Sequence, residues 1–491
     1  MPNVSQIALS AATTFVFYRF VFRDRKLDHI PTVGYSTPFL SFFSAVRFFF
    51  SGREIVEEGY RRYPGQVWKL PMLEEWLVVV NGRDRVEDIR KATQDQLSGA
   101  RSNPVFYQWD YTVGRDVTEN PYHISIVRGP MTRNLVNQFE DIRDEMLWAV
   151  NDMISCQTGE WVSVPIFQGL VEVISRITTR AFLGVDLCRN AEFRRVCTQS
   201  TIELVKGRLL HLFPNALKPL MAKLLTNVDG VLDKIEKHLA PIIEERLEQE
   251  RLHGPNWAGR PNDLITWILE GAKASHEEPT ARNVAKRVIL FTFTSTYTSA
   301  VTISQALCEL AERPKYIQPL REEVDSVLAN EGWTKASVGQ LYKLDSFFRE
   351  TQRYDGLGLV VMSRRVMKDF TFSDGTCVPA GTHLCVNARG NHRDDAHYPS
   401  ANTFDGFRFA REGGVDQHLM VTPTLDYNAF GNGRPTCPGR FFAVAELKMI
   451  LAHILSTYDV KLSEGPHPKM RWFEFKVIPN HSLRMMFRKR T

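Results

Sequence analysis

A long segment between two prolines places the strongest constraint on how this chain folds. The stretches ARNVAKRVIL and SQALCELAER are rich in good helix formers, and Pro279 and Pro314 stand where a helix would start and stop. A helix over this segment, from Pro279 to Arg313, has about 33 residues and is about 50 Å long. A single helix of that length crosses an entire domain.

The middle of this segment has a composition that is unusual for a helix. In FTFTSTYTS, Phe291 to Ser299, Thr or Ser alternates with other residues, a pattern typical of a β-strand. In a helix, Thr294, Thr298 and Thr302 share a face, and their hydroxyls can bond carbonyl groups one turn back. That bonding bends and loosens the helix, and such a local departure from propensity indicates a functional site. The alternative is a helix packed by threonine methyl groups.

The remaining pattern predicts a mainly α protein with a smaller β part. WLVVVNG, Trp76 to Gly82, predicts a buried strand closed by a turn, and Asp374-Gly375 is a hairpin turn signal. No Gly/Ser linker, repeat or low-complexity tract divides the chain. Further helices are predicted over Asp144–Ile154, Asn227–Glu250 and Ala443–Leu455.

The charge balance argues against a nucleic-acid partner. The chain has 61 Lys and Arg against 56 Asp and Glu, a net charge of +5 over 491 residues. This is far from the basic signature of nucleic-acid-binding proteins. Hydrophobic residues make up 43%, enough to form a large core.

The N-terminus predicts a single membrane anchor. Ile7 to Phe22 is largely apolar, and Arg23, Arg25 and Lys26 follow it. The positive-inside rule then places the tip in the lumen and the main body in the cytoplasm. The rival interpretation is a cleaved signal peptide, although no basic region precedes the run. A second apolar block, Phe39 to Gly52, either dips into the membrane surface or forms a core-facing helix.

One of the seven cysteines has distinctive surroundings. Cys437 lies in FGNGRPTCPGRFFA, where glycines permit a tight loop and Gly439 opens a helix. A helix N-terminus and nearby arginines favour the thiolate form. A rigid, exposed thiolate suits axial ligation of haem iron. The alternative is a buried cysteine in a turn.

The residues around this cysteine follow a known pattern. Phe430, Gly433, Cys437 and Gly439 form F-x-x-G-x-x-x-C-x-G, which resembles the haem-binding signature of the cytochrome P450 superfamily. CPGRFFA is similar to its fungal microsomal members. Upstream, ETQR matches the family's E-x-x-R motif and FDGFRF completes its Glu-Arg-Arg ion-pair set. This structural set is Glu350, Arg353 and Arg408.

The resemblance implies a cytochrome P450 fold, with residues 27–491 as the catalytic domain, residues 1–26 as the anchor and basic flank, and one long helix crossing over the haem. The cofactor is then haem b, with Cys437 as the axial iron ligand. Arg364 matches a propionate-binding position, and His123 and Arg128 are weaker candidates. Where the family usually has Arg or His two residues before the cysteine, this chain has Pro435, with Arg434 beside it. Either Arg434 replaces that contact or another group holds the propionate.

The same resemblance assigns roles within the hydroxyl run. Thr294 and Ser295 fall at the family's small pair, Tyr297 at its acid and Thr298 at its threonine. Thr298 is then the proton-delivering hydroxyl, with Thr294 and Tyr297 as other parts of the route. A shift of register by two residues would make Thr296 the central hydroxyl instead.

These assignments predict a monooxygenase that uses O2 and NADPH-derived electrons. The electrons would come from a separate NADPH-cytochrome P450 reductase at the endoplasmic reticulum membrane, docking on a basic face around Arg434, Arg440 and Lys448. By the same resemblance, the substrate pocket is lined by the segments Arg101–Gly114, Gln352–Ser363 and Phe473–Ser482. Their composition favours a small-molecule substrate that is apolar and bulky. The chain resembles fungal terpenoid-oxidising members, including ent-kaurene oxidase-like ones. The alternatives are a haem-thiolate isomerase or dehydratase without a reductase, and a catalytically impaired haem-binding protein.

Overall fold

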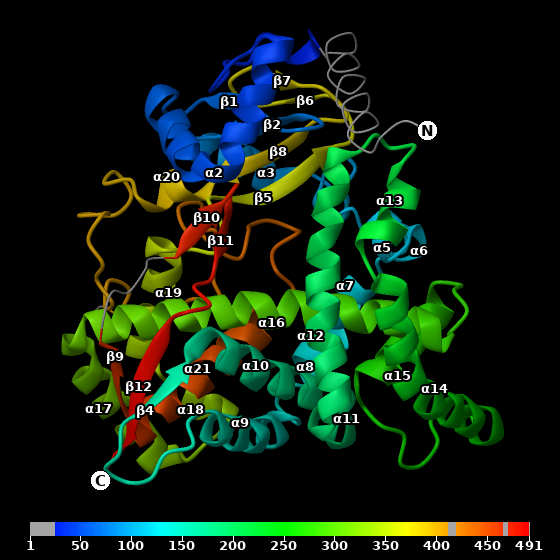
Figure 1. Ribbon diagram of the computed structural model, residues 1–491, viewed down its shortest axis with the longest axis vertical. Helices are drawn as coiled ribbons and strands as arrows, with labels where there is room; N and C mark the ends of the chain where they lie inside the picture. The colour runs from blue at the N-terminus through cyan, green and yellow to red at the C-terminus, as the bar shows by residue number, and fades with distance from the viewer. Residues whose placement is uncertain (1–24, 411–418, 465–469, 491) are drawn as a thin grey trace, which may run out of the picture.

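The computed structural model describes residues 25–410, 419–464 and 470–490, which form a mainly helical molecule (Figure 1). The predicted anchor at Ile7–Phe22 lies outside these ranges. Within them, no helix is both long enough and apolar enough to cross a membrane.

The long helix predicted from the sequence is confirmed. Helix α16 spans Ala281–Glu312, and its N-cap residue Thr280 accepts a hydrogen bond from the Asn283 amide at 3.2 Å. Pro314 begins the short turn that follows, because proline cannot continue the helical hydrogen-bond ladder. In Figure 1, α16 runs across almost the whole width of the molecule, with the largest sheet above it and most of the helical body around and below it.

Helices surround α16 on several sides. The predicted helices over 144–154, 227–250 and 443–455 are confirmed as α9 (Phe139–Met153), α14 (Val228–His253) and α21 (Arg440–Thr457). All three are longer than predicted, although Ile154 and Asn227 lie one residue outside the observed helices. The N-terminal half contains α2 (Pro38–Arg62), α3 (Arg83–Lys91), α4 (Ser102–Tyr107), α5 (Trp109–Thr112), α6 (Arg115–Glu119), α7 (His123–Ile126), α8 (Thr132–Asn134), α9 (Phe139–Met153), α10 (Ile166–Leu183), α11 (Val185–Arg189), α12 (Ala191–Lys206), α13 (Lys218–Leu225) and α14 (Val228–His253). The remainder contains α15 (Leu264–Ala274), α17 (Ile317–Glu331), α18 (Lys335–Gly339), α19 (Tyr342–Tyr354), α20 (Ala388–His392) and α21 (Arg440–Thr457).

The β part consists of one larger sheet and three small ones. The five-stranded sheet has the order β1-β2-β8-β5-β3, in which only β2 and β8 run parallel. The predicted strand after Trp76 is β2, and the Asp374-Gly375 turn joins β6 to β7, so both predictions are confirmed. The strands are β1 (Val67–Pro71), β2 (Trp76–Val80), β3 (Leu97–Ser98), β4 (Val162–Pro165), β5 (Val360–Val366), β6 (Phe370–Thr371), β7 (Cys377–Val378), β8 (His383–Asn387), β9 (Tyr458–Leu462), β10 (Arg471–Phe473), β11 (Lys476–Ile478) and β12 (Arg484–Lys489).

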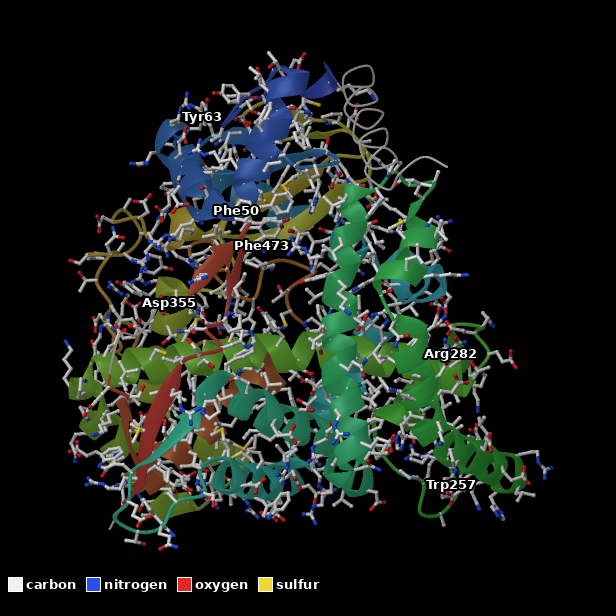
Figure 2. All side chains as sticks on the ribbon, in the orientation of Figure 1. Phe50, Tyr63, Trp257, Arg282, Asp355 and Phe473 are labelled. Carbon is white, nitrogen blue, oxygen red and sulfur yellow. The ribbon has the colours of Figure 1, made fainter. Side chains whose placement is uncertain are left out.

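The second apolar block forms the first part of α2, which is longer than the block itself. Its apolar side chains point both ways: Ala45 and Phe48 are buried, whereas Phe43 and Phe50 are exposed. Phe50 packs edge-on against Phe473 of β10, with ring centroids 6.4 Å apart, and Figure 2 shows the two side chains close together. The block is therefore partly core-facing and partly open.

The largest hydrophobic core lies around the middle of α16. Buried residues of α9, α10, α14 and α21 join those of α16 in one continuous cluster. Two smaller clusters cover the faces of the five-stranded sheet. The long helix is thus buried along most of its length, which makes any open position on it informative.

Candidate haem-thiolate site

The Cys437 loop is a tight structure immediately before α21. Gly431 and Gly433 both have φ +73°, a left-handed conformation that glycine adopts without steric cost. The Cys437 amide donates to the Phe430 carbonyl at 2.8 Å, which closes the loop on itself. A Cβ at Gly433 would lie 2.6 Å from the Arg90 carbonyl oxygen, so this glycine also lets α3 pack closely. For Gly439, the nearest atom to such a Cβ is 3.8 Å away, and no contact within the chain requires glycine there.

The sequence predicted an exposed Cys437 thiol, but in the structure the residue is half-buried. The thiol nevertheless lies near hydrogen-bond donors and positive charges. Burial raises its pKa, whereas the backbone N–H groups of Gly439 and Arg440 and the charges of Arg440 and Arg128 lower it. These are the donors expected for a sulfur at a helix N-terminus, and they stabilise the thiolate. A coordinated metal ion removes the thiol proton outright and overcomes the cost of burial. The loop therefore has the chemistry of a metal–thiolate ligand.

Arg364 is a buried cation without a carboxylate partner in the described chain. It occupies an inward-facing position of β5 and is 4% exposed. Its guanidinium donates only to two carbonyls, of Ser363 at 2.9 Å and Asn432 at 3.0 Å. Burial lowers its pKa to about 10, so the cation remains charged and lies beside the cysteine loop. A propionate is the kind of anion that fits this position.

Of the two weaker propionate candidates, Arg128 contacts the cysteine loop and His123 packs against α16. Arg128 is exposed and donates to the Arg434 carbonyl at 2.7 Å, which ties it to the cysteine loop. The Nδ1 atom of His123 is buried without a hydrogen-bond partner, and burial lowers the pKa of this histidine to about 4. Its neutral ring packs edge-on against Phe291 of α16, with centroids 6.1 Å apart. Because His123 is neutral and has a nitrogen without a partner, it fits the role of a hydrogen-bonding residue better than that of a cation that pairs with the propionate.

Pro435 lies beside Arg364. A Cβ added to Gly99 would be 2.7 Å from Pro435 Cβ and 3.5 Å from Arg364 Nη1, so these two side chains flank the same glycine. The Arg434 side chain is exposed. Arg364 is therefore placed to hold an anion that Pro435 cannot bind.

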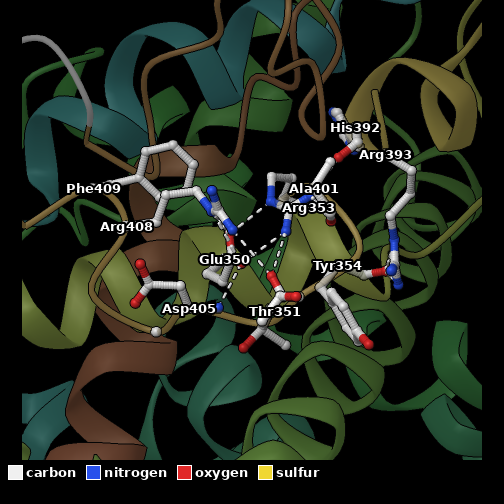
Figure 3. A network of polar contacts seen from close by, with 12 residues as sticks. Glu350, Thr351, Arg353, Tyr354, His392, Arg393, Ala401, Asp405, Arg408 and Phe409 are labelled. Carbon is white, nitrogen blue, oxygen red and sulfur yellow. Dashed lines mark hydrogen bonds and ion pairs between the residues drawn. The ribbon is translucent and has the colours of Figure 1, made fainter. Parts of the chain in front are cut away.

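The three charged residues predicted as an ion-pair set meet in the interior (Figure 3). Arg353 donates from Nε and Nη2 to the two Glu350 carboxylate oxygens at 2.7 and 2.8 Å, and both side chains are 0% exposed. Arg408 Nε lies 3.2 Å from each of the same oxygens. The Asp405 amide adds a hydrogen bond to Glu350 at 2.9 Å. The set thus fixes the loop around Arg408 to α19. Arg353 and Arg408 also donate to backbone carbonyls, which fits a structural role.

The hydroxyls of α16 make the predicted contacts. Thr294 donates to the Leu290 carbonyl at 2.8 Å, Thr298 to Thr294 at 2.9 Å and Thr302 to Thr298 at 2.9 Å. The helix nevertheless runs through this stretch without a break. Thr294 and Thr298 are exposed although the residues around them are mostly buried, whereas Thr296 is 4% exposed. The two threonines four residues apart therefore face an opening in the helical body, and Thr296 does not.

Tyr297 holds the neighbouring hairpin. Its hydroxyl donates to the Val477 carbonyl of β11 at 3.1 Å, and burial raises its pKa to about 12. It is therefore a neutral donor and not an acid at physiological pH.

The predicted substrate-lining segments meet on the same side of α16. Phe106 packs against Phe475 with centroids 5.0 Å apart, and the Leu359 amide donates to the Phe475 carbonyl at 2.8 Å. Tyr107 packs edge-on against Phe293 of α16 at 5.1 Å. The structure thus joins three segments that are far apart in the sequence into one aromatic wall.

One residue of the predicted docking face is misplaced. Lys448 is 3% exposed and lies 3.4 Å from Asp345, so it cannot contact a partner protein. The prediction failed because α21 is enclosed by other helices, and its charged residues therefore point into the interior. Sequence reasoning also missed Glu446, two residues before Lys448 on α21 and 1% exposed, for the same reason.

Comparisons with known proteins agree with this geometry. A family model described as Cytochrome P450 matches residues 38–485. Cytochrome P450 monooxygenase 151 of Postia placenta is 37% identical over 481 residues, which cover 97% of this chain and 96% of that protein. Cytochrome P450 monooxygenase CYP512U6 of Ganoderma lucidum is 34% identical over 483 residues, covering 97% and 94%. Ent-kaurene oxidase P450-4 of Gibberella fujikuroi is 29% identical over 473 residues, covering 94% and 93%.

A cysteine loop at a helix N-terminus and a long helix with open hydroxyls are features expected of a haem-thiolate oxidoreductase. The chain belongs to the cytochrome P450 family and is a monooxygenase of the fungal type. The residues present fit a haem: Cys437 would supply the thiolate ligand, and Arg364, a buried cation without a carboxylate partner in the described chain, would face a propionate. The haem, once bound, would supply the oxygen chemistry, and a thiolate ligand would favour O–O cleavage.

Proposed function

We propose that the protein hydroxylates or otherwise oxidises a bulky apolar secondary metabolite, a terpenoid, with O2 and with electrons from NADPH. The observation that carries the proposal is the Cys437 sulfur at the N-terminus of α21, with N–H donors from Gly439 and Arg440. The aromatic wall supports a large apolar substrate, since such pockets are mostly hydrophobic with few polar groups. The similarity to an ent-kaurene oxidase supports a terpenoid.

The electrons come from a separate membrane flavoprotein, an NADPH-cytochrome P450 reductase. Arg434 is the exposed cation of the cysteine loop, and it provides a contact for an acidic partner. Arg440 is less available, because it donates to the Val421 and Cys437 carbonyls at 3.2 and 3.0 Å. Charge reversal at Arg434 should raise the apparent KM for the reductase, whereas reversal at Lys234, an exposed lysine of α14, is the control.

Residues 1–26 form the anchor and basic flank in this proposal, and residues 27–491 form the catalytic domain on the cytoplasmic side of the endoplasmic reticulum membrane. The apolar run from Ile7 to Phe22 supports this placement. A chain without residues 1–26 should leave the membrane pellet upon alkaline extraction, and the full chain should stay in it. Recovery of the full chain in the soluble fraction would contradict the anchor.

In the catalytic step, Thr298 positions a proton on its hydroxyl at the exposed position on α16. Its hydrogen bond to the Thr294 carbonyl orients the hydroxyl, and Thr294 lies one turn away on the same face. Thr298→Ala should uncouple NADPH consumption from product formation. Thr302→Ala is the matched control, because Thr302 makes the same type of hydrogen bond but is buried.

The first experiment is the absorption spectrum of the reduced, CO-bound protein beside Cys437→Ala. A red-shifted Soret band in the parent that is lost in the variant supports thiolate ligation at Cys437. Cys377→Ala, at another half-buried cysteine, is the control and should retain the band. A well-folded parent without the band would remove the monooxygenase proposal. Turnover without NADPH would favour an isomerase or dehydratase, and haem binding without oxygen consumption would favour an impaired protein.

A further inference from the structure

A lysine lies where the substrate-lining segments meet. Lys476 begins β11 and forms an isolated antiparallel bridge with Gly358. A Cβ added to Gly358 would lie 3.7 Å from Lys476 Nζ, so the ammonium group lies against this backbone. The next residue, Val477, accepts the hydrogen bond from Tyr297 of α16. Lys476 is therefore close to two of the lining segments and to the long helix.

The charges around this lysine are unbalanced. Arg208, in the short helix Gly207–Leu212 after α12, forms an ion pair with Glu474 at the tip of the hairpin. Glu474 is the carboxylate that acts on Lys476, and it already has Arg208 as its partner. The Lys476 ammonium group makes no ion pair or hydrogen bond within the described ranges. Two cations and one carboxylate leave a net charge of +1.

Lys476 is only partly exposed to solvent. Its side chain retains some open surface, yet much of it is surrounded by protein. This burial is the largest cause that lowers the pKa of Lys476 to about 8, and the charge of Arg208 is the second. The other titratable neighbour, Cys385, is buried with its pKa raised, so that thiol is neutral. Lys476 therefore remains protonated at neutral pH, and its positive charge has no counterpart.

An unpaired interior charge is costly, and buried charges in proteins normally have a partner. A monoanion on the ligand would supply that partner and bring the local charge to zero. A dianion such as a phosphate monoester would leave the site with a net negative charge. Aromatic rings lie beside these charges: the Arg208 guanidinium lies 4.3 Å from the Phe106 ring centroid, and Tyr107 stacks with Trp109 at 5.8 Å. The neighbouring His211 pairs with Glu74, which also pairs with Lys218.

We propose that Lys476, with Arg208 beside it, binds a carboxylate on the substrate, so that the substrate is an apolar acid and not a hydrocarbon or an alcohol. This inference rests on the proposed function and narrows its substrate class. The carboxylate is held at the hairpin, and the apolar body extends along the aromatic wall toward Thr294 and Thr298. A carboxylate on a terpenoid is itself the product of an oxidation, so an earlier oxidising reaction must supply this substrate.

The test compares the affinities of terpenoid acids with those of their methyl esters. The full-length holoenzyme is titrated with a panel of sesqui-, di- and triterpenoid acids and the matched esters, and Kd is read from the shift of the haem Soret band. The parent should bind at least one acid about tenfold to a hundredfold more tightly than its ester, as expected for a charge-assisted contact. Affinity for the acid should fall as pH rises through about 8, because Lys476 loses its proton, while affinity for the ester should not change.

Three variants locate the effect. Lys476→Met should remove the preference for the acid and leave ester binding unchanged, and Lys476→Arg should keep the preference. Lys368→Met is the control, because Lys368 is exposed and pairs with Asp95 away from this hairpin. Equal binding of acids and esters by the parent, or no response to any acid, would overturn the inference, as would retention of the preference in Lys476→Met. The CO-bound spectrum separates the two proposals. If the parent shows the thiolate band but responds only to neutral terpenoids, the carboxylate-binding inference is rejected and the proposed monooxygenase function is kept.

Discussion

Glu446 of α21 provides the sharpest test of the packing around the long helix. The carboxyl is 1% exposed, and neither of its oxygens has a hydrogen-bond partner in the described structure. Burial raises its pKa from 4.5 to about 8, although Ser299 and Thr178 are close enough to lower it slightly. We expect Glu446→Gln, which keeps the shape and removes the titration, to change the pH dependence of stability.

The magnitude follows from proton linkage. Below pH 4.5 the carboxyl is neutral in both the folded and the unfolded chain. Between pH 4.5 and about 8, only the unfolded chain loses the proton, so the parent loses about 1.4 kcal/mol of stability per pH unit. At pH 7 the accumulated loss is about 3 kcal/mol. For a chain of 491 residues this corresponds to about 3 °C in Tm, since the unfolding entropy is about 1 kcal/mol per degree.

The assay is the thermal midpoint of parent and Glu446→Gln holoenzymes between pH 5 and 8 at a fixed scan rate. The difference in Tm, variant minus parent, should increase by about 3 °C from pH 5 to 8, whatever its value at pH 5. Glu119→Gln, at an exposed position, is the control and should show no such trend. A difference that stays constant with pH would refute the reasoning, because the carboxyl would then be ionised in the folded protein.

Three further substitutions test the cysteine loop and the ion-pair set. Gly433→Ala forces a Cβ to 2.6 Å from the Arg90 carbonyl at φ +73°, and it should destabilise the protein by about 1–3 kcal/mol in denaturant unfolding, whereas Gly339→Ala should not. Arg353→Lys leaves the buried Glu350 poorly paired and should cost about 3–5 kcal/mol, while Arg53→Lys, in an exposed pair, should cost less than about 0.5 kcal/mol. Pro435→His should retain or strengthen haem binding, measured by the rate of haem transfer to an acceptor protein, because residue 435 lies beside Arg364; faster haem loss would contradict this placement.

Much of the site could be predicted from the sequence because its parts are local. The spacing of Phe430, Gly433 and Cys437 fixes a tight loop, and Glu350 and Arg353 are one helical turn apart. Helical periodicity likewise placed Thr294 and Thr298 on one face. Patterns of this kind depend on covalent connection and helix geometry, and the tertiary structure preserves them.

The environment of charged residues could not be predicted in this way. Glu446 and Lys448 lie on a helix enclosed by others, so their burial depends on the packing of distant segments. Lys476 and Gly358 meet only because the β10–β11 hairpin folds back onto the chain before β5. No local pattern in the sequence carries this information.

The partners of interior charges separate structural from ligand-binding residues in this chain. Arg353 and Lys448 are buried beside carboxylates of the chain, Glu350 and Asp345, so their charges are balanced upon folding. Arg364 has no carboxylate partner in the described chain, and the carboxylate that acts on Lys476, Glu474, is already paired with Arg208. Folding alone does not favour such positions, because an unpaired interior charge opposes it. We propose that a bound anion compensates that cost at each cation: a propionate of the cofactor at Arg364 beside the cysteine loop, and a carboxylate of the substrate at Lys476 beside the aromatic wall.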